Sequence, residues 1–370
     1  MTNTKAHIQL PAPHKRNWRD WNEAQPEFLS TDSRFEQRLS TPQDFPEIYT
    51  LLHSVFEDSR SHAAYDWIYE QNPYGKARCE LIIEKSSGQI VSTSARFPWP
   101  LMKGDQELEL TQGGDSATLK RLQRQGLYSL RKTFEQSHPW YNKHINLGLP
   151  NSLSRAASRK YNLPSAELAM PFAKKILDWQ GFLIGKGVSS YLAKTVAPVG
   201  KFITRTFVHL PSDHKIEPIV RFSHEHQSLS LKLSRSEGYW CPHGAQWMNW
   251  RYFSHPSKKY VAHGLYSRDE LKAFGVIRLD SEKAMLMELV SPDRQSSRAL
   301  LNEIERAALE SGAKTIETYA SSCWQHWPAL NQQRYFKRPS NIFVTTRSVD
   351  IADVSHPKNW TILPGDSDVF

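Results

Sequence analysis

The stretch Asp115-Ser-Ala-Thr-Leu-Lys-Arg-Leu-Gln-Arg-Gln-Gly-Leu-Tyr128 decides the fold that we predict for this chain. In residues 106–112, just before it, apolar and polar residues alternate as in a half-buried strand. From the end of the stretch onward, over residues 127–134, the apolar residues follow helical spacing. The sequence therefore predicts that a strand enters this stretch, a basic loop turns, and a helix leaves at Gly126.

The start of the predicted helix has the chemistry of an anion-binding turn. Gly126 lacks a Cβ atom, so a ligand can approach the backbone closely there. The first amides of a helix have no intrahelical acceptor, and the helix dipole attracts anions to that end. Arg121 and Arg124 add positive charge beside the turn. This combination predicts a cradle for a pyrophosphate group.

The segment Gln123-Arg-Gln-Gly-Leu-Tyr128 resembles the core motif of the GCN5-related N-acetyltransferases, which reads Gln/Arg-x-x-Gly-x-Gly/Ala at a helix start. Tyr128 takes the place of the last small residue, Thr118 stands where a Val is usual, and Lys120 stands where a Pro is usual. The matching positions also fit an ordinary basic turn between a strand and a helix. The order of the flanking elements therefore has to decide between the two interpretations.

The elements predicted over residues 35–165 follow the order of the acetyltransferase fold, β-α-α-β-β-β-α-β-α. They are placed at 35–39, 41–55, 63–71, 79–85, 89–97, 106–112, 127–134, 144–149 and 151–160. The resemblance extends to Trp67-x-Tyr69-x-x-Asn72-Pro73-x-Gly75 and to Gly148-Leu-Pro-Asn151. Both patterns recur at these places in a subgroup that carries two such domains.

The composition fits a globular chain with two domains. Its 370 residues exceed the roughly 100–200 of one domain, and 39% of them are hydrophobic. No apolar run approaches the roughly 20 residues that span a bilayer, and the first seven residues have no apolar signal segment. Three scattered cysteines, Cys79, Cys241 and Cys323, fit a reducing compartment. We therefore expect a cytoplasmic protein.

The net charge of +9 suits acidic partners, such as coenzyme phosphates, an acidic carrier protein, nucleic acid or an anionic membrane surface. A basic solubilising surface explains it equally well. The sequence shows no helix-turn-helix pattern, no aromatic RNA-binding signature and no concentrated basic run, so no nucleic acid partner is expected. The histidines are scattered without zinc-ligand spacing, and no metal is expected.

The second half repeats the theme, because Trp247-Met-Asn-Trp-Arg-Tyr-Phe-Ser-His-Pro256 echoes the stretch from Trp67 to Pro73. Strands are predicted at 259–265, 271–279, 284–289, 315–319 and 342–348, and helices at 298–311 and 324–335. At the matching turn, Ser291-Pro-Asp-Arg-Gln-Ser-Ser-Arg298, Gln/Arg-x-x-Gly is absent. The second copy is therefore predicted to lack a coenzyme site and to serve as a scaffold or an acceptor-side wall.

Five segments result from this reading of the chain. They are an N-terminal extension at 1–34, a first acetyltransferase-like domain at 35–170, a linker at 171–209, a second such domain at 210–350 and a polar tail at 351–370. The linker is basic, apolar and dotted with glycine, with six Lys or Arg and one acid between Lys174 and Arg205. It is predicted to be a helical hairpin. Its apolar side either packs on the two domains or contacts a membrane or carrier protein.

The resemblance implies which residues hold an acyl-coenzyme A. The backbone at Ala117 and Thr118 would hydrogen-bond the pantetheine arm and the acyl carbonyl. The amides from Arg124 to Tyr128 would hold the pyrophosphate. The implied cofactor-binding residues are Ala117, Thr118, Gln123, Arg124, Gln125, Gly126, Leu127, Tyr128 and Asn151. Two have simpler explanations: Asn151 can cap the helix that follows it, and Tyr128 can pack under the loop.

Two residues are candidates for proton transfer. Asp115 is the nearest acid on the predicted strand and could relay the proton of the attacking amine, or it could be structural. Tyr161 follows the helix at 151–160, near where the family often keeps a tyrosine beside the coenzyme sulfur. It could protonate the leaving thiolate, or it could be a core aromatic residue.

These observations favour an acyl-coenzyme A dependent N-acyltransferase that acts on a small amine, such as an amino sugar or amino acid. Acetyl-coenzyme A or another acyl-coenzyme A would be the co-substrate. Three alternatives stay open: an acyltransferase that takes its acyl group from acyl carrier protein, a binding or regulatory protein with a vestigial coenzyme pocket, and an aminoacyl-tRNA dependent peptide-bond former. The intact turn at Gln123–Gly126 counts against the last, since that group usually lacks a coenzyme cradle.

Overall fold

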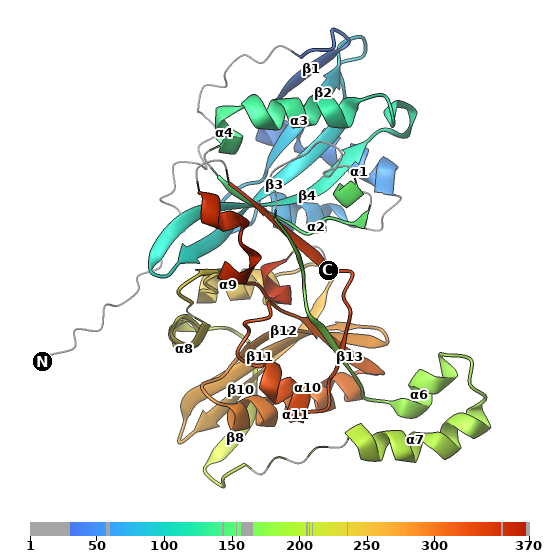
Figure 1. The fold of residues 1–370 in the computed structure, drawn as a ribbon, viewed down its shortest axis with the longest axis vertical. Coiled ribbons are helices and arrows are strands. Elements are labelled where there is room, and N and C mark those ends of the chain that lie inside the picture. Colours follow the sequence, from blue (N-terminus) through green and yellow to red (C-terminus); the bar gives the residue numbers. More distant parts are fainter. Residues whose placement is uncertain are drawn as a thin grey trace, which may run out of the picture. The chain divides into compact units, whose positions relative to one another are not determined.

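The computed structural model describes residues 30–56, 60–142, 144–152, 154–156, 166–204, 206, 208, 210–234, 236–348 and 351–367. The chain divides into two compact units. The first contains the chain up to Leu168 and Phe343–Asn359, and the second contains Ala169–Ile342 and Trp360–Asp368. Each unit has a mostly antiparallel sheet flanked by helices, so the predicted α/β class is confirmed (Figure 1).

The sheet of the first unit has the strand order β1-β2-β3-β4-β5-β15-β6. Strands β1 to β4 pair antiparallel in sequence order, β5 lies parallel to β4, and β15 lies antiparallel to β5. The strands span Phe35–Leu39 (β1), Arg78–Glu84 (β2), Gln89–Lys103 (β3), Gln106–Thr118 (β4), Ile145–Gly148 (β5), Phe343–Arg347 (β15) and Ala166–Ala169 (β6).

Helices cover both faces of this sheet. Arg96 of β3 donates to Glu135 of α3, whereas the next residue, Phe97, packs its ring 5.2 Å from that of Tyr69 in α2. Successive strand residues point to opposite faces, so α3 and α2 lie on opposite sides of the sheet. The helices span Phe45–Phe56 (α1), His62–Tyr69 (α2), Leu127–Ser137 (α3) and Pro139–Asn142 (α4), with 3-10 turns at Pro42–Asp44 and Lys120–Leu122.

The sheet of the second unit has the strand order β14-β7-β13-β12-β11-β10-β8. Its strands span Phe336–Arg338 (β14), Phe172–Ile176 (β7), Thr315–Tyr319 (β13), Lys283–Val290 (β12), Glu270–Asp280 (β11), Lys259–Ser267 (β10) and His214–Ile219 (β8). Strands β12 and β13 are parallel, and the pairs on either side of them are antiparallel. A short parallel pair, Tyr239–Trp240 (β9) with Trp360–Thr361 (β16), completes the strands described here.

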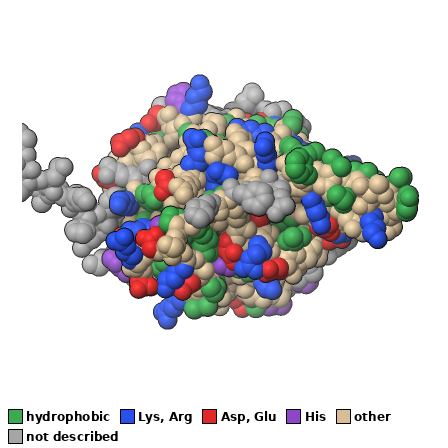
Figure 2. Space-filling view, turned by 90° about the horizontal axis from the view of Figure 1, so that it is seen from below, with side chains coloured by type: hydrophobic (Ala, Val, Ile, Leu, Met, Phe, Trp, Pro, Cys, Tyr) green, Lys and Arg blue, Asp and Glu red, His purple; other side chains and the backbone are tan. Residues whose placement is uncertain are grey.

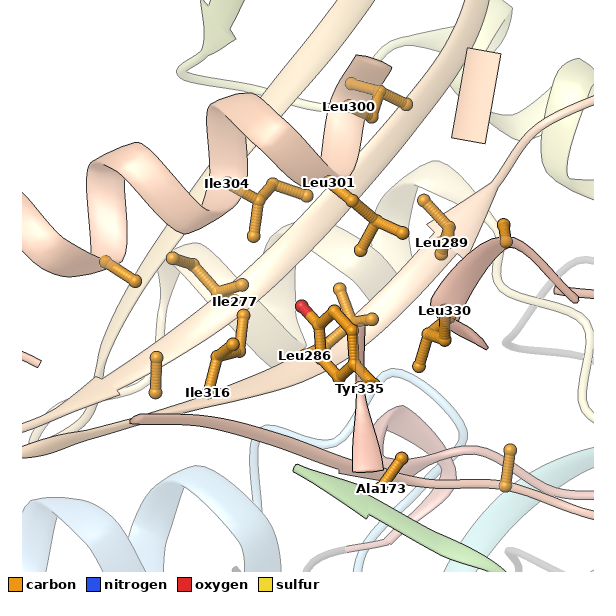
Figure 3. Close-up of a cluster of buried hydrophobic side chains, with 14 of the residues drawn as sticks. Ala173, Ile277, Leu286, Leu289, Leu300, Leu301, Ile304, Ile316, Leu330 and Tyr335 are labelled. Carbon is orange, nitrogen blue, oxygen red and sulfur yellow. The ribbon is translucent and has the colours of Figure 1, made fainter. Parts of the chain in front are cut away.

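The core of the second unit lies between its sheet and α10 (Figure 3). Leu300, Leu301 and Ile304 project from α10 toward Ile277, Leu286 and Ile316 of the sheet, and all six are fully buried or nearly so. The helices of this unit span Trp179–Ile184 (α6), Ser190–Thr204 (α7), His224–Ser234 (α8), Ala245–Met248 (α9), Arg294–Glu310 (α10) and Trp327–Gln332 (α11). A π-helical turn at Asn249–Phe253 follows α9, and a 3-10 turn lies at Pro364–Asp366. Two further 3-10 turns, at Ala352–Ser355 and Pro357–Asn359, belong to the first unit.

The start of the predicted linker is a strand, which corrects the prediction of a helical hairpin from residue 171 onward. Residues Phe172–Ile176 form β7, which pairs with both β13 and β14. The two lysines that suggested a basic surface here are paired with acids: Lys174 Nζ lies 2.6 Å from Glu317, and the buried Lys175 Nζ lies 2.5 Å from Glu305. The helical part of the segment is α6 and α7.

The last predicted strand of the second domain belongs to the other sheet. Residues 343–347 form β15, which pairs with β5 through Thr345 and Gly148, Thr346 and Leu147, and Arg347 and Asn146. The predicted boundaries at 170, 210 and 350 therefore do not match the compact units, because each unit takes strands from both halves of the chain.

Part of the segment predicted as a polar tail, 351–370, is buried. Ile362, Leu363, Gly365 and Asp366 are buried within the second unit. A Cβ atom on Gly365 would lie 2.1 Å from Glu288 Oε1 and 2.5 Å from the Tyr252 hydroxyl oxygen, closer than real Cβ atoms come. The end of the chain is thus fitted against β12 and the π-helical turn.

The fit at Gly365 predicts a stability effect that composition would not suggest. Gly365→Ala should lower the free energy of unfolding by about 1–3 kcal/mol, the usual range for overpacking. The matched control is Gly185→Ala, where the new Cβ would meet its nearest atom at an ordinary 3.4 Å. Urea unfolding followed by fluorescence measures both. Equal midpoints for the two variants would contradict the placement of the C-terminal segment.

Candidate active site

Strand β4 separates from β5 halfway along its length. Their parallel pairing runs from Leu110 with Ile145 to Gly113 with Gly148, while β4 continues to Thr118. On its other side β4 keeps pairing with β3, but its register shifts between the Ala95–Gly114 and Thr93–Ala117 pairs, so β4 carries one extra residue. Such a bulge bends and twists a strand. The backbone from Gly114 to Thr118 is therefore free of β5 pairing on one edge.

Asp115 occupies this bulge and is held by two side chains. Its φ of +43° lies in the left-handed region, which Asp tolerates better than most residues. Arg60 Nη1 donates to both carboxylate oxygens at 2.9 and 3.1 Å, and the Tyr69 hydroxyl donates to Oδ2 at 3.1 Å. The carboxylate is 9% exposed. Burial, followed by the Asp115 charge, raises the pKa of Tyr69 well above its usual value, so Tyr69 keeps the proton that it donates.

The predicted turn has the backbone shape that an anion cradle needs. After the 3-10 turn at Lys120–Leu122, Arg124 and Gly126 both have positive φ, +66° and +89°. Gly126 is the N-cap of α3, and a Cβ atom there would meet nothing within 4 Å. The Gln123 side chain donates from Nε2 to the Thr118 carbonyl at 3.1 Å, which ties the turn back to the end of β4.

The charge beside the turn is smaller than the sequence suggests. Arg121 donates to both carboxylate oxygens of Glu84, at 2.8 and 2.7 Å, so its charge is balanced locally. Hydrogen bonds from Arg121 and Ser87 lower the pKa of Glu84 to about 2. Arg124 is exposed and pairs with no acid among the residues that the structure describes. Positive charge at the turn therefore rests mainly on Arg124 and the helix end.

The other predicted coenzyme residues lie along the same path. Ala117 is buried, and its carbonyl oxygen accepts a hydrogen bond from the Ser92 hydroxyl at 2.9 Å. The Thr118 hydroxyl lies 2.8 Å from the Ser92 hydroxyl. Gln125 is exposed and Leu127 is buried under the turn. The Tyr128 ring lies 5.4 Å from the Arg131 guanidinium and 5.3 Å from Lys132 Nζ, which supports a packing role for that ring.

Asn151 lies within the described residues, whereas Tyr161 does not. Asn151 Oδ1 accepts from the Ser154 amide at 2.9 Å, so its role as a helix cap is confirmed, while a contact to pantetheine stays a prediction. Tyr161 lies outside the described residues, as do the last residues of the helix predicted at 151–160. Within the described residues no group of three or more His, Cys, Asp or Glu could hold a metal ion.

Strands β12 and β13 of the second unit repeat the geometry of β4 and β5. They pair in parallel only from Lys283 with Thr315 to Met285 with Glu317, and β12 carries a register shift near Met287. Here the 3-10 turn at Pro364–Asp366 packs against β12. The C-terminal segment of the same unit thus covers the part of β12 that has left its neighbour.

A buried polar network fixes that segment. His243 lies with Nδ1 2.8 Å from Glu288 of β12 and with Nε2 2.7 Å from Asp366, and its ring stacks on Trp247 with centroids 4.1 Å apart. The Tyr252 hydroxyl donates to the same Glu288 oxygen. Burial by itself would lower the pKa of His243, but the Glu288 and Asp366 carboxylates outweigh it and raise that pKa to about 10. His243 is therefore the cation of the network at neutral pH.

The helix that follows β12 begins without a glycine turn. Asp293 is the N-cap of α10, and its carboxylate accepts from the Ser296 amide at 2.8 Å and from the Ser296 hydroxyl at 2.8 Å. This cap also explains why α10 begins at Arg294 rather than at the predicted Arg298. The Asp293 carboxylate thus occupies the N-terminal end of α10, whereas the corresponding end of α3 in the first unit begins at Gly126, which has no side chain.

Sequence reasoning missed the partners of the site rather than its backbone. Arg60 and Tyr69 hold Asp115, yet they lie 55 and 46 residues away from it, and no local pattern marks them. Tyr69 did belong to the stretch that resembled the tandem subgroup. His243, Glu288 and Asp366 are likewise far apart in the sequence, and their types alone fit a surface equally well.

Comparison with solved structures supports the fold. The chain resembles a probable N-acyltransferase from Enterococcus faecalis V583 (TM-score 0.61, 10% identity, 85% of this chain and 73% of that one). It also resembles a GCN5-related N-acetyltransferase from Anabaena variabilis (TM-score 0.57, 11% identity, 84% of this chain and 72% of that one). A third similar structure is the N-myristoyltransferase of Saccharomyces cerevisiae (TM-score 0.54, 11% identity, 90% of this chain and 85% of that one). No family model and no curated protein matches the sequence. The chain has the predicted acetyltransferase fold in two copies.

The protonated His243 predicts how stability depends on pH. Its folded pKa is raised, so its contribution is complete below the unfolded pKa of about 6.5 and is lost as pH rises toward about 10. Wild type should lose up to about 1.4 kcal/mol of unfolding free energy per pH unit relative to His243→Gln in this window. Urea unfolding at pH 6–10 measures the difference. His224→Gln, at an exposed histidine of α8, should run parallel to wild type; a parallel His243→Gln curve would contradict the prediction.

Proposed function

We propose that the first unit binds an acyl-coenzyme A and transfers its acyl group to an amine. The observation that carries this proposal is the continuity of one path: β4 leaves β5 after Gly113, keeps an open edge to Thr118, and leads within eight residues to the helix end at Gly126. An open strand edge can hydrogen-bond an extended amide chain. A helix end with a left-handed glycine can hold a pyrophosphate. Pantetheine and pyrophosphate follow each other in coenzyme A in this order.

Each part of the path has a distinct task in this proposal. The backbone at Ala117 and Thr118 holds the pantetheine arm and polarises the thioester carbonyl. The amides at Arg124, Gly126 and Tyr128 receive the pyrophosphate, and Gln123 keeps the turn attached to β4. Support comes from the fold shared with the N-myristoyltransferase, whose structure was solved with bound myristoyl-coenzyme A.

The reaction needs little more than position and proton transfer. The neutral amine attacks the thioester carbonyl carbon, a C–N bond forms, and the C–S bond breaks. The amine loses a proton and the thiolate gains one, so no further reactant is consumed. In this proposal Asp115 relays the amine proton, and Tyr161 protonates the thiolate. The ion pair with Arg60 keeps the Asp115 carboxylate oriented at the bulge.

The acceptor in this proposal is a small amine such as an amino sugar or amino acid. The donor is acetyl-coenzyme A, or a longer acyl-coenzyme A as in the N-myristoyltransferase fold. Acyl carrier protein as donor and a non-catalytic coenzyme-binding protein are the alternatives. Incubation with acetyl-, octanoyl- and myristoyl-coenzyme A and with acylated carrier protein, each with a panel of amines, separates these by the mass of the product.

The second unit serves as a scaffold in this proposal. Its corresponding strand edge is covered by Pro364–Asp366, and its helix end already carries the Asp293 carboxylate. A second anion at that end would be repelled by this charge. We therefore expect one coenzyme for each chain, which calorimetry can count.

The cradle at Gly126 gives the sharpest test of the coenzyme site. Gly126→Glu should weaken coenzyme A binding at least tenfold, about 1.4 kcal/mol, because it places a carboxylate in the open space before α3. Gly312→Glu is the matched control, since Gly312 has a nearly equal φ of +91° and a new Cβ there would meet only one atom within 4 Å, at 3.9 Å. It therefore carries the same charge change and similar backbone strain. Equal affinities of the two variants in calorimetry would refute the cradle.

The proton-transfer roles are tested by rate profiles. Tyr161→Phe should lower kcat about 10²–10⁴-fold with coenzyme binding nearly unchanged, since only the hydroxyl is lost. Asp115→Asn should lower the rate most at low pH, where the amine is protonated, and higher pH should partly restore it. Tyr69→Phe removes one hydrogen bond from Asp115 but keeps the carboxylate, so its pH–rate profile should keep the wild-type shape. A purely structural Asp115 would instead give Asp115→Asn a lower Tm and an unaltered profile shape.

A further inference from the structure

The helical hairpin α6–α7 is packed on its inner side by unusually small residues. Ala193, Ala197, Gly200 and Thr204 are the buried residues of α7. The Trp179 ring of α6 fills the space at Gly200, where a Cβ would come 2.2 Å from it, and Trp179 Nε1 donates to the Thr204 hydroxyl at 3.1 Å. The small stripe lets the two helices approach closely. The orientation of α7 on α6 is therefore fixed.

The opposite face of α7 is apolar and exposed. Tyr191 and Phe202 are each 82% exposed, and Leu192, Val196, Val199 and Ile203 are between 49% and 59% exposed. At 100° per residue, Tyr191 and Phe202 lie opposite the small residues, and the four aliphatic residues lie along one flank of the helix between the two. Hydrophobic side chains gather on the projecting segment in Figure 2, at the side where Figure 1 shows α6 and α7. A soluble helix normally shows the reverse arrangement.

The charge of the hairpin is of one sign. Residues 179–204 contain Lys186, Lys194 and Lys201 and no Asp or Glu. All three lysines are exposed, and none pairs with an acid within the part of the chain that the structure describes. Lys194 and Lys201 lie seven residues apart and share the other flank of the helix, beside Tyr191 and Phe202 and away from the four aliphatic residues. An apolar face edged by lysines is the composition of helices that lie in the headgroup region of a membrane.

We propose that the outer face of α7 docks on the surface of an anionic lipid bilayer, with Tyr191 and Phe202 inserted and Lys194 and Lys201 among the headgroups. The charge argues against a second copy of this chain as the occupant, because two copies would bring two sets of lysines together without an acid in the hairpin. This is surface contact: within the described residues no helix is long and apolar enough to cross a membrane.

The test is co-sedimentation of the full chain with sucrose-loaded vesicles at physiological ionic strength. Vesicles of phosphatidylcholine alone are compared with vesicles of phosphatidylcholine and phosphatidylglycerol at a ratio of about three to one. Wild type should partition at least about tenfold more strongly to the anionic vesicles, since each lysine near such a surface contributes a few-fold. Phe202→Asp should reduce binding about tenfold or more. The double variant Lys194→Glu with Lys201→Glu should remove the preference for anionic lipid.

Matched controls separate this contact from general stickiness. Val220→Asp changes a residue that is 85% exposed elsewhere in the second unit, and Lys259→Glu with Lys283→Glu repeats the charge change on exposed strand residues. Both should bind vesicles like wild type. Absence of binding, equal binding to both vesicle types, or unchanged binding of Phe202→Asp would each overturn the proposal. Sedimentation velocity tests the other occupant. If the chain does not bind vesicles but self-associates, and Phe202→Asp abolishes that self-association, the occupant is a second copy and the proposal is overturned.

Discussion

The pairing of β15 with β5 is the contact on which the candidate site depends most. Strand β5 has only four residues, and it bounds the place where β4 turns away. Without a partner on its far side it would be a short edge strand, which is a weak element in any sheet. The partner comes from Phe343–Arg347, almost two hundred residues later. The open edge of β4 in the first unit is therefore supported by a strand from the end of the chain, and β7 makes the reverse contribution to the second sheet.

Local sequence predicted what local forces determine. The strand, basic turn and helix around Gly126 were recognisable because the alternation of β4, the glycine and the helical spacing all lie within 30 residues. The exchange of strands was not recognisable, because Phe172–Ile176 has two adjacent lysines and reads as an exposed basic segment. Those lysines are accommodated by Glu317 and Glu305, which lie 143 and 130 residues away. Pairings of this range leave no periodic trace in the sequence.

Charge counting misled for the same reason. The basic residues at the turn and in the segment from residue 171 onward suggested positively charged surfaces, but Arg121, Lys174 and Lys175 each meet a carboxylate within 2.8 Å. A paired charge has little influence beyond its partner. Among the described residues, Arg124 at the turn and the lysines of the α6–α7 hairpin are exposed cations that pair with no acid. The sequence gives the number of charges, and tertiary contacts decide which of them are paired.

The two units share one arrangement of strands but differ in what covers it. Both have a parallel strand pair that separates early and a register shift on the longer strand. In the first unit the path ends at a glycine with φ of +89° and unclaimed space around it. In the second it ends at Asp293, and Asp366, His243 and Glu288 join the C-terminal segment to the strand edge. Buried charges of this kind are costly unless all are paired, so loss of one member leaves the others uncompensated. A single substitution in this network should therefore destabilise the second unit, whereas our proposal places the coenzyme in the first unit, at the corresponding strand edge and helix end.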